Sequence, residues 1–179
     1  MKPGARIAAF SSGPIKRGSG AKVLLVGVVS KQGQVEGILS GRIRTDGDDS
    51  ARTIEGLVSG SRFRDQVKIV ALNGVALAGL NVVDLKHLKS KGYEHVILTR
   101  SRQRHSLLIR AIRLNKGRNT NKERLVREQA EIRQLRAGDF YIRASTALPK
   151  VMVREIYEAL RLSHMISNGI STGESKGRI

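Results

Sequence analysis

The chain of 179 residues has the length of one domain, and its 33 Lys and Arg residues against 15 Asp and Glu residues give a formal net charge of +18. It contains no cysteine, which excludes disulfides and thiolate metal sites. Aromatic residues are only 3%, which argues against a platform for stacking single strands. No apolar run approaches the ~20 residues of a membrane span and no signal peptide is visible, so we expect a soluble cytoplasmic protein without membrane partners.

The first part of the sequence predicts a three-stranded meander. Apolar segments over residues 6–10 and 23–29 predict two strands, and Gln32-Gly33 forms the turn into a third strand over residues 35–44.

An acidic turn follows the third expected strand. Asp46, Asp48 and Asp49 occupy it, and Asp residues are suited to cap the helix that we expect over residues 50–61. Capping and turn formation are more common roles for such residues than metal binding. A metal-ligand role for Asp46 is the alternative.

A central strand is predicted at Val67–Leu72, because its unbroken apolar run is typical of a strand covered on both faces. Asn73-Gly74 ends the run, and a glycine-bearing loop leads to a helix expected to begin near Asn81. Ligands and catalytic groups gather at the carboxyl end of central strands in open α/β sheets. The residue at that end is an amide and not a carboxylate, which weighs against an enzyme.

After a further strand expected at Glu94–Thr99, the chain becomes strongly basic. Residues 100–136 hold 12 basic and 3 acidic residues, a net charge of +9 that is half of the total. We expect a charged helix over residues 121–136, a short edge strand over residues 140–143, and a last helix with Pro149 in its first turn.

The basic segment indicates a polyanionic partner, because three acids cannot pair with twelve cations. A solvated helical face with ion-pair networks is the alternative interpretation. The residues that we expect to contact nucleic acid, DNA or RNA, are Arg100, Arg102, Arg104, Arg110, Arg113, Lys116, Arg118 and Lys122.

The order of the expected elements is that of an α/β protein. A three-stranded meander followed by βα units, with a mixed sheet flanked by helices, is the layout of the ribonuclease H-like fold. We therefore expect one domain over residues 1–179, with a basic helical segment at about 100–136. In this fold the first and fourth strands are adjacent and parallel, which would bring Ser11 and Asn73 together.

Four stretches carry a resemblance to a known family: DGDDS at residues 46–50, NGVALAGLNVVD at 73–84, LRLSHMISNGI at 160–170 and GESKGR at 173–178. They resemble an uncharacterised, mainly archaeal family that is itself similar to endonuclease V. The resemblance implies a ribonuclease H-like fold. For endonuclease V it implies cleavage of nucleic acid near deaminated bases with a divalent metal.

The resemblance also implies where an active site would lie. Endonuclease V needs acids at the ends of the first and central strands and after the third, because a divalent ion on a scissile phosphate requires converging anionic oxygens. The first-strand position matches Ser11 or its neighbour Ser12, and the central one matches Asn73, so both have lost their charge. Asp46 retains the acid after the third strand, and His164 matches a polar catalytic position on the last helix.

These observations leave three hypotheses. The leading one is a nucleic-acid-binding relative of endonuclease V that is catalytically degenerate and needs no cofactor. The second is an active endonuclease on deaminated-base nucleic acid that uses Mg2+ or Mn2+. The third is a non-enzymatic protein-interaction module with an acidic partner. The active enzyme would have to rebuild its site from Asp46, Asp48, Asp49, Asp84 and His164.

Overall fold

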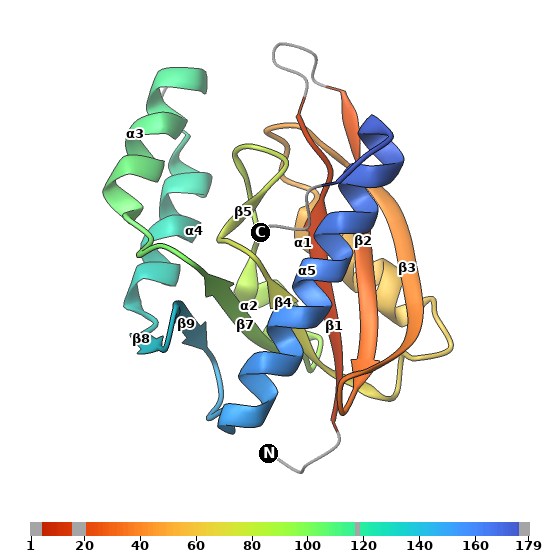
Figure 1. Cartoon of the computed structure of the whole chain (residues 1–179). Helices are drawn as coiled ribbons and strands as arrows, with labels where there is room; N and C mark the ends of the chain where they lie inside the picture. Colours follow the sequence, from red (N-terminus) through yellow and green to blue (C-terminus); the bar gives the residue numbers. More distant parts are fainter. Residues whose placement is uncertain (1–4, 16–20, 117–118, 176–179) are drawn as a thin grey trace.

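The computed structural model describes residues 5–15, 21–116 and 119–175, and a seven-stranded sheet runs through it with the strand order β3-β2-β1-β4-β7-β9-β8 (Figure 1). β1 (Arg6–Ser12), β2 (Lys22–Lys31) and β3 (Gln34–Arg44) form the antiparallel meander that the sequence predicts. β1 also pairs in parallel with β4 (Val67–Leu72), as expected. β1 and β4, at whose carboxyl ends Ser11 and Asn73 lie, are therefore neighbours in the middle of the sheet.

The other half of the sheet differs from the prediction at its edge. β4 pairs in parallel with β7 (Glu94–Thr99), and β9 (Phe140–Ala144) pairs antiparallel with β7. The edge strand is β8 (Gln134–Ala137), so the prediction that residues 140–143 form the edge is wrong, and so is the prediction of helix at residues 134–136. The two-residue turn Gly138-Asp139 joins β8 to β9, a dipeptide typical of hairpins.

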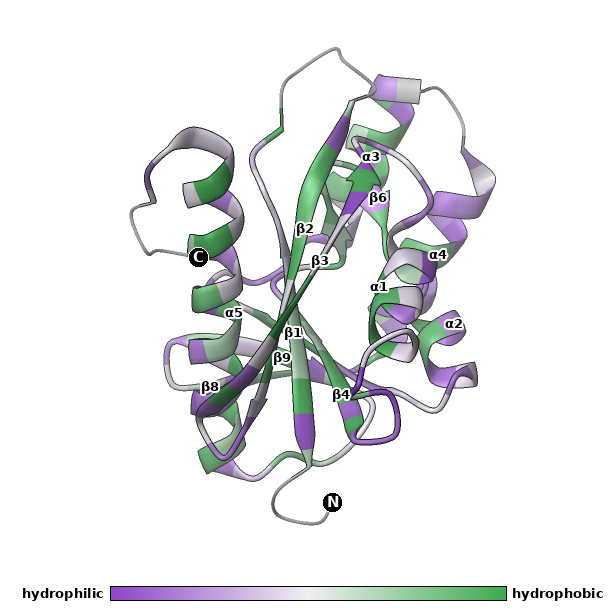
Figure 2. Ribbon diagram, turned by 90° about the vertical axis from the view of Figure 1, so that its right-hand side faces the viewer, coloured by the Kyte–Doolittle hydropathy of each residue, from purple (hydrophilic) through white to green (hydrophobic). Residues whose placement is uncertain are grey.

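Helices cover both faces of the sheet, which lies between α5 on one side and α1 and α2 on the other (Figure 2). α1 (Ser50–Ser59) confirms the helix expected over residues 50–61, and α2 (Leu85–Ser90) packs beside it. α5 (Lys150–Thr172) is the last helix, and Pro149 is its N-cap residue, one position before the expected first turn. No helix within the described ranges combines the length and the apolar character needed to cross a bilayer.

Close packing fixes the middle of the sheet. Phe10 of β1 is fully buried, and its ring lies so close to Gly27 of β2 that a Cβ atom at position 27 would overlap it. Only glycine leaves room for the ring there. This contact anchors β1, whose carboxyl end carries Ser11 and Ser12.

A small hairpin stands where the sequence predicts the start of a helix near Asn81. β5 (Ala76–Leu77) pairs antiparallel with β6 (Asn81–Val82), and the turn between them uses positive φ at Ala78 (44°) and Gly79 (83°). The prediction of a helix from Asn81 is therefore wrong. α2 begins four residues later, where the Asp84 carboxylate accepts a hydrogen bond of 2.9 Å from the His87 N–H.

The basic segment folds as two helices beside the sheet (Figure 1). α3 (His105–Lys116) lies within the basic helical segment expected at about 100–136, although its own bounds were not predicted, and α4 (Thr120–Glu131) is shorter than the helix expected over residues 121–136. The two helices pack against each other and against the hairpin through a small apolar cluster formed by Val82, Ile112, Leu125 and Val126. The segment is thus a helical hairpin docked on the main fold.

Candidate functional site

The carboxyl ends of β1 and β4 bring together the side chains that the sequence singles out. The Asn73 amide donates to Ser11 Oγ over 3.3 Å, and Ser11 Oγ lies 3.4 Å from His164 Nδ1 on α5. This confirms the expected proximity of Ser11 and Asn73. Ser11 is fully buried, so the contact lies inside the fold.

Asn168 completes this group. It follows His164 by one helical turn, and its amide nitrogen donates to the His164 carbonyl over 2.8 Å and lies 3.2 Å from Nδ1. Asn168 was not predicted as a site residue, although the spacing of four residues on a helix places its side chain on the same face as that of His164. We call Ser11, Asn73, His164 and Asn168 the strand-end cluster. It contains no carboxylate.

Asp46 serves a different set of contacts. Its carboxylate accepts hydrogen bonds from the Leu80 N–H over 2.7 Å and from the Asn115 amide over 2.9 Å. Its backbone has a positive φ of 53°, and its N–H donates to the Ala78 carbonyl over 2.9 Å. Asp46 therefore joins the end of β3 to the β5–β6 hairpin and to α3.

Ser12 is bound to the same hairpin. Its hydroxyl accepts a hydrogen bond of 2.9 Å from the Ala78 N–H. Of the two serines that match the first acidic position, Ser11 belongs to the strand-end cluster and Ser12 binds the turn of the hairpin.

Lys122 lies inside the fold, although it was expected to contact nucleic acid. Lys122 is only 5% exposed, and its ammonium donates to the carbonyls of Asp46 (2.6 Å) and Leu80 (2.8 Å). This cation is engaged by main-chain oxygens and is not available at the surface for a phosphate.

The remaining acids near the turn have separate local roles. Asp49 accepts hydrogen bonds from the Asn81 amide (2.7 Å) and from the Arg44 backbone and guanidinium. Burial raises the pKa of Asp49, but these hydrogen bonds outweigh it and hold the pKa below its usual value. Asp48 is exposed, 3.8 Å from Arg44, and Asp84 caps α2.

The residues of the strand-end cluster do not fit a catalytic divalent ion. Such an ion needs several converging anionic oxygens, whereas Ser11 and Asn73 are uncharged and the Asp46 carboxylate binds the hairpin and α3. Within the part of the chain that the structure describes, no three His, Cys, Asp or Glu side chains converge in a way that could hold a metal.

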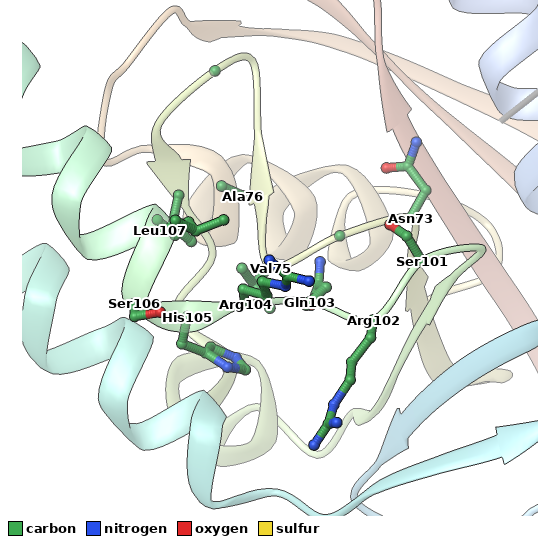
Figure 3. A pocket seen from close by; sticks show the side chains of 13 residues that line it. Asn73, Val75, Ala76, Ser101, Arg102, Gln103, Arg104, His105, Ser106 and Leu107 are labelled. Carbon is green, nitrogen blue, oxygen red and sulfur yellow. The ribbon is translucent and has the colours of Figure 1, made fainter.

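A hollow of about 1010 Å³ opens beside Asn73 (Figure 3). One wall is the loop after β4, and the other is the segment after β7 that carries Arg102, Gln103 and Arg104. A smaller hollow of about 350 Å³ shares Asn73 and Gln103 and adds Arg100. None of the 13 residues that line the larger hollow is acidic, so its charge is positive.

Two residues that line the larger hollow, Gln103 and His105, carry buried polar atoms. Gln103 Oε1 and His105 Nε2 are both inaccessible and have no hydrogen-bond partner among the described protein atoms. Burial, and then the charge of Arg143, lowers the pKa of His105. Neither residue was singled out in the sequence, since an isolated Gln or His in a basic stretch carries no pattern.

The expected phosphate-binding residues fall into distinct groups. The guanidinium groups of Arg102, Arg104 and Arg110 are exposed and form no hydrogen bond or ion pair within the described residues; we call these three the free arginines. Arg113 instead forms two hydrogen bonds to Glu123, of 3.0 and 2.6 Å.

The other members of that set are placed as follows. Arg100 donates to the Tyr157 hydroxyl over 2.6 Å and remains exposed. Lys116 ends α3, with its side chain outside the description, and Arg118 lies outside the described residues altogether.

Comparison with known proteins gives a family. The family model described as Endonuclease dU matches residues 3–171. A UPF0215 protein of Thermococcus kodakarensis is 32% identical, over 98% of this chain and 97% of the relative. A UPF0215 protein of Methanothermobacter thermautotrophicus is 30% identical, over 99% of this chain and 93% of the relative.

Solved structures confirm the fold. A protein of unknown function from Archaeoglobus fulgidus matches with a TM-score of 0.77 and 27% identity, over 92% of this chain and 97% of that one. Human endonuclease V matches with a TM-score of 0.54 and 11% identity, over 92% of this chain and 83% of that one. The predicted α/β, ribonuclease H-like fold and the predicted resemblance are therefore both confirmed.

Proposed function

The chain belongs to the endonuclease dU family, and from that premise we propose that it binds nucleic acid without cleaving it. The observation that carries the proposal is the hollow at the carboxyl end of β4. Its lining includes Asn73, an amide, and also Arg102 and Arg104, whose guanidinium groups are exposed. A site of this kind attracts phosphate but supplies no carboxylate at the strand end.

The free arginines support the binding half of the proposal. Exposed guanidinium groups without acidic partners form charge-assisted hydrogen bonds to phosphate oxygens and release counterions when they do so. The family description and the name of the human structural relative both denote an endonuclease, which is consistent with a nucleic-acid partner.

The strand-end cluster supports the second half. Coulomb attraction from two missing carboxylates is worth several kcal/mol to a divalent ion even at an effective dielectric constant of ~20. Ser11 and Asn73 provide none of it, and Asp46 is held by the hairpin and α3. We therefore propose that cleavage through Mg2+ or Mn2+ is lost and that the cluster now has a structural role, in which its polar contacts connect β1, the end of β4 and α5.

Two measurements on the purified protein test the proposal. Fluorescence anisotropy with labelled DNA and RNA between 50 and 200 mM salt should give an affinity that falls linearly on a log–log plot. Incubation with oligonucleotides that contain deoxyuridine or inosine, in Mg2+ or Mn2+, should give no product.

The opposite results identify the alternatives. Robust turnover that Asp46→Ala abolishes would establish the metal-dependent endonuclease. A salt-insensitive affinity, or no binding at all, would favour a protein-interaction module with an acidic partner.

A further inference from the structure

A second hollow lies between the β8–β9 hairpin and the start of α5. It measures about 550 Å³, and its lining includes the rings of Phe140 and Tyr157. The whole chain has only six aromatic residues, three Tyr and three Phe, and two of them meet here with their ring centroids 4.6 Å apart. Both side chains are half-buried and so still present ring surface to the hollow.

Arg100 connects this aromatic hollow to the arginine-lined surface. Its guanidinium donates to the Tyr157 hydroxyl over 2.6 Å, and its Cζ lies 5.7 Å from the centroid of the Tyr157 ring. The same residue lines the smaller hollow that contains Asn73. Arg100 therefore lies between the smaller hollow beside Asn73 and the aromatic pair Phe140 and Tyr157.

The charges around the aromatic hollow favour an anionic ligand with an apolar body. Lys150 and Arg154 line it and are exposed. The one acid in the lining, Glu158, forms an ion pair with Arg161 over 2.9 Å. An apolar hollow whose lining carries two exposed cations matches a nucleotide, which combines a flat ring with a phosphate.

We infer that the aromatic hollow holds one unpaired base of a nucleic-acid single strand whose phosphates contact Arg100 and the free arginines. The inference rests on the proposed function and adds the form of the partner: a single strand, not a duplex. Bases stack on aromatic rings whatever their sequence, because every base has a π-face, and a Tyr ring with an adjacent guanidinium is a favourable platform. A low aromatic content argued against such a platform, but content does not show that two of the six rings share one hollow.

The test compares three probes of 20 units: single-stranded oligo-dT, the same backbone with abasic residues, and a mixed-sequence duplex. Phe140→Leu with Tyr157→Leu should weaken the binding of oligo-dT by roughly 5- to 100-fold, the range for loss of base stacking. Binding of the abasic strand should not change. Tyr157→Phe keeps the ring without the hydroxyl and should bind oligo-dT like the parent to within a few-fold.

Tyr141→Leu is the matched control. It removes a ring from the same strand at a position that does not line the hollow, and it should leave all three affinities unchanged. If the double variant does not fold, an oligo-dT with one 5-iodouracil is cross-linked to the parent protein instead, and mass spectrometry should find the adduct on Phe140 or Tyr157.

The outcomes separate this inference from the proposed function. A parent protein that binds none of the probes contradicts the proposed function itself. A parent that binds oligo-dT and the abasic strand equally well overturns only the base subsite. So does a double variant that loses affinity for both strands, because the rings would then act by positioning Arg100. A cross-link found elsewhere also overturns it.

Discussion

The strand-end cluster with its surroundings and the basic helical segment differ in whether their charged side chains have partners within the protein. Around β1, β4 and the β5–β6 hairpin, side chains are either uncharged or bound by the fold: Ser11 and Asn73 bind each other, and Asp46 holds Leu80 and Asn115. Along residues 100–113, the free arginines have no acidic partner among the described residues.

The difference indicates which charges serve folding and which remain for a partner. A buried polar group without a hydrogen bond costs more than the bond contributes, so changes in the first region should alter stability. Exposed cations contribute little to stability, so changes in the second should alter binding instead. Net charge alone cannot make this distinction, because Lys122 and Arg110 count equally toward +18.

Restoring the missing acids should give the largest effect. Ser11→Asp with Asn73→Asp places a fully buried carboxylate beside a half-buried one and should lower the free energy of unfolding at neutral pH by about 3–5 kcal/mol in EDTA. Millimolar Mn2+ should recover part of the loss, since it would neutralise the new charges. Urea unfolding with and without the metal measures both.

Ser11→Asn is the matched control for that variant. With the native Asn73 it has the same shape as the double Asp variant but no charge, so it should be clearly more stable and should not respond to Mn2+. A double Asp variant as stable as the parent in EDTA would show that the strand-end cluster tolerates charge, which contradicts the comparison.

Lys122→Met should have the next largest effect. The substitution leaves the Asp46 and Leu80 carbonyls without the ammonium and should lower the free energy of unfolding by about 3 kcal/mol. Arg127→Met, an exposed cation on the same helix, should change it by less than about 0.5 kcal/mol. Equal losses in the two variants would remove the distinction between bound and free cations in this segment.

The sequence predicts the main sheet because long apolar runs determine it. β1, β2, β4 and β7 follow from such runs, β3 follows from the Gln32-Gly33 turn, and the contact of Ser11 with Asn73 follows from the strand order. β5 and β6 were not predicted, because a strand of two residues shows no periodicity in the sequence. Only the Gly138-Asp139 turn could have indicated β8.

Tertiary contacts explain the other failures. Asn81 suited a helix start, yet its side chain is fully buried and donates to the Arg44 carbonyl over 2.9 Å. Lys122 suited a surface cation, yet its partners lie 76 and 42 residues away along the chain. Partners so distant in sequence leave no local signal at either residue.

Removing the free arginines should affect binding rather than stability. Arg102→Ala with Arg104→Ala and Arg110→Ala should weaken binding to all sequences by about 10- to 100-fold near 0.1 M salt. It should also flatten the log–log salt slope by about 2 units for a single strand. The melting temperature should stay close to that of the parent, because these side chains have no bonds to lose.

A second triple variant controls for net charge. Arg64, Arg113 and Arg124 each form an ion pair, with Asp65, Glu123 and Glu128 respectively. Changing these three to Ala removes the same three positive charges, but it should weaken binding much less. Equal effects of the two triple variants would mean that total charge, and not the position of unpaired arginines, determines affinity.

The smallest expected effect is on the pH dependence of stability and concerns Asp49, whose carboxylate is hydrogen-bonded within the fold. Hydrogen bonds from Asn81 and Arg44 outweigh the effect of burial and keep its pKa below the usual 3.8. A carboxyl whose pKa is depressed by folding contributes stability that is fully present above the unfolded pKa and is lost as the pH falls through the folded one.

The stability difference between the parent and Asp49→Asn should therefore be constant between pH 5 and 7 and shrink below about pH 3.8. Thermal unfolding over pH 2–7 measures it, with Asp48→Asn as the control, since the exposed Asp48 has only a 3.8 Å contact with Arg44. A difference that persists unchanged to pH 2 would mean that the Asp49 carboxylate is not held by these bonds, and the turn at β3 would then owe its geometry to Asp46 and Lys122 instead.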